Sequence, residues 1–546
     1  FFFFFSFLLL LIVFLLLWVI MRLSSLLLLL LLAVVGAAAQ TLATNVSFLC
    51  ADWPVTSFGA VGDGVTDDTA AFRAALAAAA AARGCVHVPP VPAGRGYVLT
   101  GTVTIPPGVA LVGRAAGFPE VPWANPPPGD FNTTGGSRIL ARPSGAAAAG
   151  YALPPLFVVN AGCTVRGLFI DYDTMPYPTD EQLQTPQSPF YYPDFATARA
   201  RFYSDHLPSV GPTFMVVQGR YVVIEDVDGY GFRDFLYVGP GAGQSHFRRL
   251  HGWGYGTFIA VEMAADVLSF DTVHYIVNSG PHAVGPRPAW CPGPPAPPRQ
   301  PDVCRGNFSW LPGIVAAQPS NVGLWLGRAD GYVARELFFF GINTAVRYGY
   351  SPASPHTALV SPVTGQPLPP QDVATGPWGA VSTLMVDQCV VGLHFVWPNP
   401  LTNRFTNVQI HPSFAVANDP FPAANGSGVL ANVSRESAVL VDATHTTANN
   451  KGLPAVVMLA NLAIASFADT PRFGPLSAML SDSNGRVFLL GGDALFEVAQ
   501  FSCNNVPNAS AMLWASAAGA RASLRIRSPI LNGIPVQDIH VLLALG

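Results

Sequence analysis

A short apolar unit recurs through the middle of the chain. Ile224-x-x-Val227, Phe247-x-x-Leu250 and Phe270-x-x-Val273 place their second apolar residues 23 positions apart. Evenly repeated short units predict a solenoid, in which each coil adds strands to one continuous core. Similar units occur at less even spacing, at Val165-x-x-Leu168-x-Ile170, Ala334-x-x-Leu337-x-Phe339, Phe405-x-x-Val408-x-Ile410 and Leu459-x-x-Leu462-x-Ile464.

Stretches rich in Pro, Gly or Asn separate these units and predict loops inserted between coils. The four candidate insertions are Asp173–Pro212, Pro281–Ser320, Ser351–Pro377 and Pro412–Glu436. No linker divides the repeat region sharply, so we expect one β-helix domain over residues 50–540.

Side chains alternate between the two faces of a strand. If Val227, Leu250 and Val273 face the core, the residues that follow them, which are Asp228, His251 and His274, face outward. On consecutive coils these three side chains form one column, with neighbours about 4.8 Å apart. In the less even units the corresponding residues include Phe169, Phe338 and Gln409.

A different pattern opens the chain's repeat region, where residues 57–76 read SFGAVGDGVTDDTAAFRAAL. The glycines predict turns, and Thr66 or Asp67 is suited to cap a helix that runs to about Arg83 and stops at Gly84. Short strands are expected after the helix, at Cys85–Val88, Tyr97–Leu99 and Thr102–Ile105.

This opening resembles the N-terminal segment of the pectate-lyase-like superfamily over roughly fifty residues. The resemblance implies an all-β fold: a single-stranded right-handed parallel β-helix with an N-terminal capping helix and long inserted loops. It does not imply one reaction, because polygalacturonases, rhamnogalacturonases, β-1,3-glucanases, epimerase-like proteins and phage tailspikes share it. We therefore expect Asp63, Asp67 and Asp68 to build turns and the helix cap and to take no part in catalysis.

The charge balance limits the partners. The formal net charge is −4 and only 11% of the residues are charged, so the chain has no basic stripe of the kind that nucleic-acid binding requires. We expect no nucleic-acid partner.

Residues 1–39 are strongly apolar. Met21-Arg22, the apolar run Leu26–Val35 and the small residues of 36–39 predict a signal peptide cleaved after Ala39. The alternative is a membrane anchor, because the almost wholly apolar run Phe1–Ile20 is long enough to span a bilayer. We expect a secreted protein without stable membrane association after cleavage. Six N-x-Ser/Thr sequons fit the secretory route, at Asn45, Asn132, Asn307, Asn425, Asn432 and Asn508.

The seven cysteines show no metal-binding spacing, so no metal or other cofactor is expected. In an oxidising compartment Cys291 and Cys304 would most simply pair with each other, because a local loop costs the least entropy to close. The remaining cysteines are either disulfide-bonded or buried thiols.

The column around Asp228 has the residue types that glycosidic hydrolysis needs, which are a carboxylic acid and a second carboxylate. The catalytic candidates are Asp228, Asp226, His251, His274, Asp171 and Asp271. The substrate-binding candidates are Arg249, Tyr230, Trp253, Tyr255 and Asp173, with the aromatic rings stacking on sugars. The competing interpretation is a solvated face of mutually paired charges, in which Asp171 or Asp173 caps a turn.

The sequence departs from known members of the superfamily. Polygalacturonase-like members carry Asn-Thr-Asp, Asp-Asp, Gly-His-Gly and Arg-Ile-Lys in order, whereas here Asn343-Thr344 is followed by Ala345 and Gly-His-Gly is absent. The acidic calcium cluster of pectate lyases is not recognisable either. We expect a glycoside hydrolase that acts on a polysaccharide or glycan in a groove on the β-helix. The alternatives are a polysaccharide lyase, with Arg249 neutralising a uronate, and a non-catalytic carbohydrate-binding or cell-surface protein.

Overall fold

The computed structural model of the chain describes residues 52–114 (except 83 and 93), 136–144, 153–173, 185–189, 191–193, 197, 201, 205, 212–276 (except 265), 320–349, 377–395, 402–412, 437–441, 455–464, 486–490, 494–503, 513–515 and 521–544 (except 532, 533, 536 and 538). These residues all belong to one compact unit, Asp52–Gly546. The apolar residues 1–39, the six sequons and the Cys291–Cys304 pair lie outside the described residues. The expectations attached to them therefore stay predictions.

The opening motif forms the expected cap. Strand β1 (Asp52–Pro54) and the short helix η1 (Val55–Phe58) lead into helix α2 (Thr69–Ala82). The inner side of α2 is apolar and fully buried at Phe72, Ala75, Leu76 and Ala79, which packs the helix against the first coils. The backbone N–H of Gly84 donates to the carbonyl of Ala79 (2.8 Å) and ends the helix, as expected.

The aspartates of the motif are structural, which confirms the expected role. Asp63 accepts hydrogen bonds from the backbone of Val65 and Thr66, and these bonds lower its pKa to about 2. Asp67 accepts a hydrogen bond from the backbone N–H of Thr69 (3.0 Å) and so caps the helix. Of the two capping residues that the sequence suggested, Thr66 and Asp67, the structure therefore uses Asp67. Asp68 is 1% exposed and accepts from Val61 N (2.6 Å) and Gly62 N (3.2 Å).

Asp68 is the most enclosed of the three, so its loss should affect stability most. The substitution Asp68→Ala leaves two enclosed backbone N–H groups without an acceptor, and we expect it to lower the free energy of unfolding by about 2 kcal/mol. Urea denaturation of the whole protein measures this change. Asp63→Ala is the matched control with a smaller loss, because water can replace the exposed Asp63 carboxylate. Equal losses in the two variants would contradict the role given to Asp68.

The strands pair in three parallel ladders, here called faces a, b and c, and each coil crosses all three. Face a begins with β1, β2 (Cys85–His87) and β5 (Ala110–Val112), and face b begins with β3 (Tyr97–Leu99) and β6 (Arg138–Ala141). Both ladders continue in strands that turn from face a to face b: β8 (Thr164–Asp171), β10 (Val223–Phe232), β12 (His246–Gly254), β14 (Ser269–Ile276), β17 (Asn403–Pro412), β19 (Ala455–Ile464), β21 (Ala494–Cys503) and β23 (Arg521–Leu531).

Face c contains the shorter strands β4 (Val103–Ile105), β7 (Phe157–Val159), β9 (Thr213–Val217), β11 (Asp234–Val238), β13 (Ile259–Ala264), β18 (Ser437–Val441), β20 (Arg486–Leu490) and β22 (Leu513–Ala515). Two long strands, β15 (Val322–Tyr348) and β16 (Trp378–Phe395), bend through several faces. At the C-terminal end β24 (Ile534–Pro535) and β25 (Ile539–Ala544) pair antiparallel with β23.

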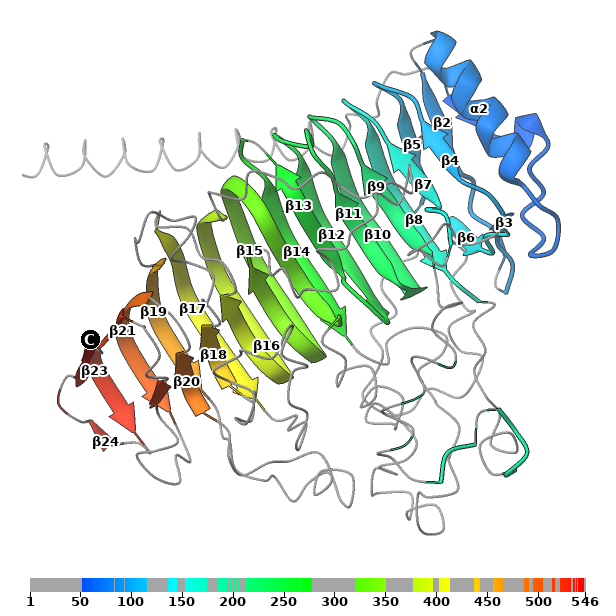
Figure 1. Cartoon of the computed structure of the whole chain (residues 1–546). Helices are drawn as coiled ribbons and strands as arrows, with labels where there is room; N and C mark the ends of the chain where they lie inside the picture. The colour runs from blue at the N-terminus through cyan, green and yellow to red at the C-terminus, as the bar shows by residue number, and fades with distance from the viewer. Residues whose placement is uncertain are drawn as a thin grey trace, which may run out of the picture. The chain divides into compact units, whose positions relative to one another are not determined.

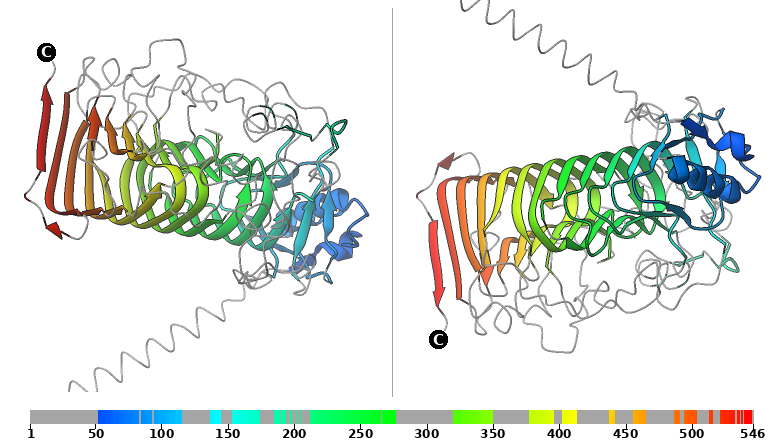
Figure 2. Two further views of the ribbon diagram at one scale, coloured as in Figure 1. Left: turned by 90° about the horizontal axis from the view of Figure 1, so that it is seen from below. Right: turned by 90° about the horizontal axis from the view of Figure 1, so that it is seen from above.

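This arrangement is a single-stranded right-handed parallel β-helix, as the sequence predicted. Figure 1 shows α2 beside the first strands and the labelled strands following one another toward β23. The two views of Figure 2 show successive coils stacked along one axis. Among the described residues no helix is long and apolar enough to cross a membrane.

The register of the coils agrees with the repeat read from the sequence. Val227, Leu250 and Val273 are paired neighbours in the core and at most 1% exposed. The less even units take the same places on β8, β15, β17 and β19. Two further units with the same pattern were missed, Val381-x-x-Leu384-x-Val386 on β16 and Val498-x-x-Phe501-x-Cys503 on β21.

A corner that the sequence did not reveal separates face a from face b. From β8 to β23, each described strand that turns from face a to face b has one residue at the corner with a left-handed backbone and φ between 50° and 68°, namely Gly167, Asp226, Arg249, Thr272, Glu336, Thr383, Asn407, Asn461, Gln500 and Ser528. Nine of the ten are not glycine, and such a residue costs roughly 1–2 kcal/mol. Contacts between neighbouring corners offset this cost, as in the hydrogen bond from Asn461 Nδ2 to Asn407 Oδ1 (2.9 Å).

Candidate functional site

Asp228, His251 and His274 lie in register on β10, β12 and β14, on face b. They are on the outer side of the strand, because the neighbouring Gly229 faces the core: a Cβ there would lie 2.4 Å from the Phe235 ring. They are more enclosed than expected, since Asp228 is 9% exposed, His251 is 2% exposed and His274 is half-buried. The structure therefore forms the predicted column and removes most of it from solvent.

Asp228 and Asp226 have opposite electrostatic environments. Burial, together with the negative charge of Asp226, raises the pKa of Asp228 to about 7. Asp226 lies at the corner, where the Arg249 guanidinium holds it through Nε and through Nη2 (2.8 Å to Oδ2). These hydrogen bonds lower the pKa of Asp226 despite its partial burial. One carboxyl therefore keeps its proton near neutral pH while the other is ionised.

His251 is held by Tyr230, whose hydroxyl lies 3.0 Å from His251 Nδ1. Burial, and then the nearby His274, lower the pKa of His251 well below its ordinary value. With His251 uncharged, its 3.9 Å approach from Nδ1 to Asp228 Oδ1 is a polar contact and not an ion pair. Burial also lowers the pKa of His274, opposed by the charge of Glu336, and the His274 ring meets Phe338 edge-on at 5.9 Å.

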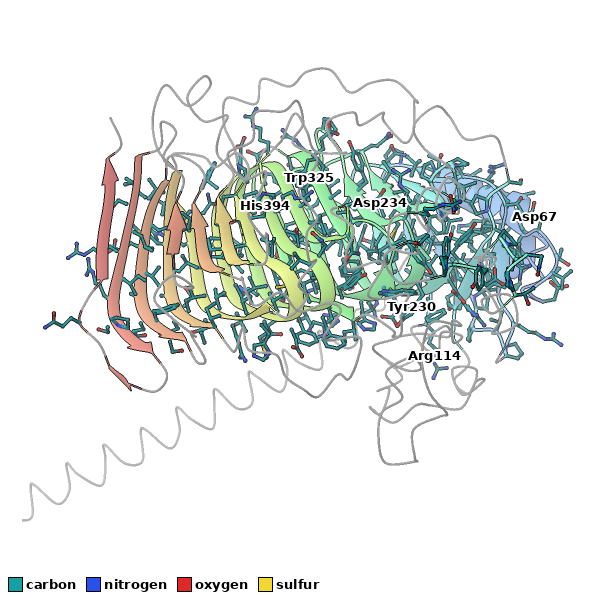
Figure 3. The ribbon with its side chains drawn as sticks, turned by 60° about the horizontal axis from the view of Figure 1, so that its bottom comes forward. Asp67, Arg114, Tyr230, Asp234, Trp325 and His394 are labelled. Atoms are coloured by element: carbon teal, nitrogen blue, oxygen red, sulfur yellow. The ribbon has the colours of Figure 1, made fainter. Side chains whose placement is uncertain are left out.

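The three predicted stacking aromatics are enclosed. Tyr230, Trp253 and Tyr255 are 2%, 1% and 0% exposed, and the Trp253 and Tyr255 rings pack together with centroids 5.1 Å apart. Tyr230 also packs on Phe169 (5.3 Å). None of the three presents an open ring face to a sugar in this structure, so the expected stacking surface is corrected to a packed aromatic layer next to the column. Figure 3 labels Tyr230, and shows it on a different side of the coils from Trp325 and His394 of face c.

Asp171 and Asp173 each form an ion pair with an arginine near the first coils. Asp171 is 0% exposed and contacts Arg138 Nη2 at 2.6 Å, and the Arg138 guanidinium also lies 5.7 Å from the Phe169 ring centre. Arg142 holds both oxygens of Asp173 and donates through Nη1 to the carbonyl of Gly64 (2.8 Å). The first pair neutralises a buried carboxylate beside Tyr230, and the second ties the first coils to the cap.

Asp271 lies on face a, around the corner from Asp228. It takes its place in a ladder of alternating charge along successive coils, made of Arg166, Glu225, Arg248, Asp271 and Arg335. Glu225 is contacted by Arg166 (3.8 Å), by Arg249 (3.3 Å) and by Arg248. For Asp271 the structure therefore agrees with the competing interpretation, which is a face of paired charges. Asp271 does not lie in the Asp228 column.

A second polar cluster on face b was missed. Asp387 and His411 are paired neighbours on β16 and β17, and His411 Nδ1 lies 3.2 Å from Asp387 Oδ1. The amide nitrogen of Gln409 lies 3.4 Å from His411 Nε2. Extending the repeat search to the unit on β16 would have drawn attention to Asp387, since it follows the last apolar residue, Val386.

Cysteines and metals add little to the site. Cys163 and Cys389 are buried, whereas Cys85 is disulfide-bonded. In the part of the chain that the structure describes, no group of three or more His, Cys, Asp or Glu side chains is arranged to hold a metal ion.

Residues 54–134 match a family model described as rhamnogalacturonase A/epimerase, pectate lyase-like, which confirms the resemblance of the opening motif. No curated protein sequence matches the chain. A mutant tailspike protein of E. coli bacteriophage HK620 in complex with a hexasaccharide has a TM-score of 0.46 at 8% identity, over 88% of this chain and 66% of that one. The chain thus spans just under two thirds of the tailspike's length.

Two further solved structures are similar at a comparable level. An exopolygalacturonase from Thermotoga maritima has a TM-score of 0.36 at 10% identity, over 90% of this chain and 95% of its own. A mutant DFA-IIIase from Arthrobacter chlorophenolicus A6 in complex with DFA-III has a TM-score of 0.34 at 13% identity, over 83% of this chain and 94% of its own. The fold assignment rests on the strand register described above and not on these values.

Proposed function

We propose that this chain, a pectate-lyase-like parallel β-helix protein, is a glycoside hydrolase with its reacting centre at Asp228 and Asp226. The observation that carries the proposal is the contrast between the surroundings of the two carboxyl groups: Asp228 is 9% exposed beside His251, whereas Asp226 is hydrogen-bonded by the Arg249 guanidinium. Burial accordingly raises the pKa of Asp228 to about 7, and the hydrogen bonds from Arg249 lower the pKa of Asp226. A pair of carboxyls whose environments push their pKa values apart is the arrangement that separates a general acid from its ionised partner.

The roles follow from these protonation states. Asp228, protonated near neutral pH, donates its proton to the oxygen of the leaving sugar as the glycosidic bond breaks. Asp226, ionised beside Arg249, either activates the attacking water or attacks the sugar carbon itself. His251, oriented by the Tyr230 hydroxyl, and the half-buried His274 offer uncharged donors and acceptors for sugar hydroxyls.

The same surface favours a hydrolase over a lyase. Elimination from a uronate needs a positive group beside the sugar carboxylate, and from Phe169 to Gln409 the described outer column of face b contains no Lys or Arg. Arg138, which precedes this column, is engaged by Asp171, and Arg249 is engaged by Asp226 and Glu225. We therefore propose a substrate that is uncharged where it crosses these coils.

A secreted location belongs to the same proposal. The signal-peptide pattern and the six sequons support it, and the disulfide bond of Cys85 is of the kind that persists in oxidising compartments. The glycan itself is the expected partner.

The pH dependence of turnover tests the assignment of acid and base. On a panel of uncharged polysaccharides (glucan, xylan, mannan and galactan), we expect kcat/KM to fall as the pH rises through about 7, because Asp228 loses the proton that it donates. A second fall is expected below the ordinary aspartate range, where Asp226 becomes protonated. Reducing-sugar release measures both limbs, with polygalacturonate as the charged comparison.

The control for this profile is Asp271→Asn on face a, which should leave both limbs in place. Activity that continues to rise above pH 8 would remove Asp228 as the acid. Binding of a glycan without turnover at any pH would leave the binding-only interpretation, in which the same column merely holds sugar.

A further inference from the structure

The outer surface of face b changes character along the coils. Its first column follows the register from Asp228 through His251 and His274 to Phe338, Met385 and Gln409. The polar first three are followed by an apolar pair, half-buried Phe338 and 44% exposed Met385, and then by polar Gln409. Between Asp228 and Gln409 the strip is therefore first polar, then apolar, and then polar again.

The far polar end is the cluster of Asp387, His411 and Gln409, which the proposed reaction does not use. Asp387 Oδ1 lies 3.2 Å from His411 Nδ1 and so orients the imidazole, and Gln409 lies beside its other nitrogen. The Asp387 and His411 side chains are 40% and 34% exposed, so they are more accessible to a ligand than Asp228 and His251. Five coil steps separate Asp228 from Gln409, or about 24 Å, which is too far for one glycosidic bond.

We propose that Asp387, His411 and Gln409 form a second glycan-binding station, which holds the distal part of the chain whose scissile bond lies at Asp228. The proposal rests on the proposed function and names its substrate class, an extended and uncharged glycan that lies along the coils. A sugar unit in a linear chain is about as long as one coil step, so successive units meet successive coils.

The chemistry of the strip fits such a ligand. Sugar rings have apolar faces and polar edges, and Phe338 and Met385 offer apolar contacts where the chain passes between the stations. At the far end a carboxylate, an imidazole and an amide supply donors and acceptors for hydroxyl groups. A carboxylated sugar would instead meet Asp387 with no Lys or Arg in the described column to offset the repulsion.

The test is a length series of substrates. Disaccharides through octasaccharides of the cello-, xylo- and manno-series are assayed with the whole protein and with His411→Ala. In the unmodified protein kcat/KM should rise with length until the chain reaches Gln409. In His411→Ala we expect about a tenfold loss on the longest substrates, through KM, with kcat and the shortest substrates unchanged. Gln409→Ala should show the same length-dependent loss, more weakly.

The matched control is Glu497→Gln, which breaks a comparable exposed ion pair with Arg527 away from face b and should leave the length series unchanged. Unfolding curves verify that all variants fold. An equal effect of His411→Ala on short and long substrates, or no effect, would contradict the proposal that these residues form a second glycan-binding station.

The proposed function can fail separately from the station. If the unmodified protein cleaves nothing, calorimetric binding of the same oligosaccharides still tests the second station. In that case His411→Ala should remove the gain of affinity with length, and an unchanged gain would overturn the proposal. If long substrates are cleaved but Asp228→Asn is fully active, the assignment of the reacting centre to Asp228 is wrong. The length dependence of His411→Ala still tests the second glycan-binding station in that case.

Discussion

The substitution Asp228→Asn is expected to lower kcat on the best uncharged substrate at least a hundredfold while substrate binding persists. The amide has nearly the same size as the carboxyl group but cannot donate an acidic proton to the leaving oxygen, and general-acid contributions are typically of this size. Initial rates of reducing-sugar release and calorimetric binding of the same oligosaccharide measure the two effects. Loss of binding together with turnover would contradict a purely catalytic role.

Stability provides an internal control for this variant. The raised pKa of Asp228 means that ionisation is opposed in the folded protein, so the carboxyl costs stability as the pH rises from about 4, the ordinary aspartate value, to about 7. Above pH 7 the cost is constant. Asp228→Asn removes it, and we expect a gain on the order of 2–4 kcal/mol at pH 8 and little change at pH 4. A variant that is inactive and more stable at pH 8 cannot owe its inactivity to misfolding.

The β-helix could be predicted because its signals are local and repeated. The units at Val227, Leu250 and Val273 are evenly spaced, and their register places Asp228, His251 and His274 in one column, as expected. The cap was equally accessible, since each aspartate of its motif bonds to backbone within a few residues. Periodicity therefore determined which residues align.

What periodicity could not give is the environment of the aligned residues. The expected alternation places Trp253 outside the core, but whether an outer side chain meets solvent depends on what packs over it, and Trp253 is 1% exposed. The corners were missed because most are not glycine: Asp226 and Arg249 adopt positive φ through coil-to-coil contacts that no local signal encodes. The partner of Asp171 was missed for a related reason, because Arg138 lies 33 residues earlier on another strand.

The ion pair of Arg138 and Asp171 leads to the largest expected loss of stability. Arg138→Met leaves the Asp171 carboxylate, 0% exposed, without its charged partner, and also removes the guanidinium from above Phe169. Removal of one partner of a buried pair typically costs 3–5 kcal/mol, so we expect a loss of about 3 kcal/mol in the free energy of unfolding at pH 7, measured by urea denaturation.

The pH dependence of that loss identifies its cause. With Arg138 absent, burial raises the folded-state pKa of Asp171 above its unfolded value, so the carboxyl is protonated more readily in the folded protein. The deficit should therefore shrink as the pH falls through that raised pKa, and it should stay large at pH 7 and above. Arg142→Met breaks the more exposed pair with Asp173 and is the control with the smaller loss.

A double variant, Arg138→Met with Asp171→Leu, should recover most of the stability, because an apolar pair leaves no buried charge behind. If the double variant is no more stable than Arg138→Met, the packing of the Arg138 side chain, and not the charge of Asp171, holds β6 (Arg138–Ala141) against β8 (Thr164–Asp171).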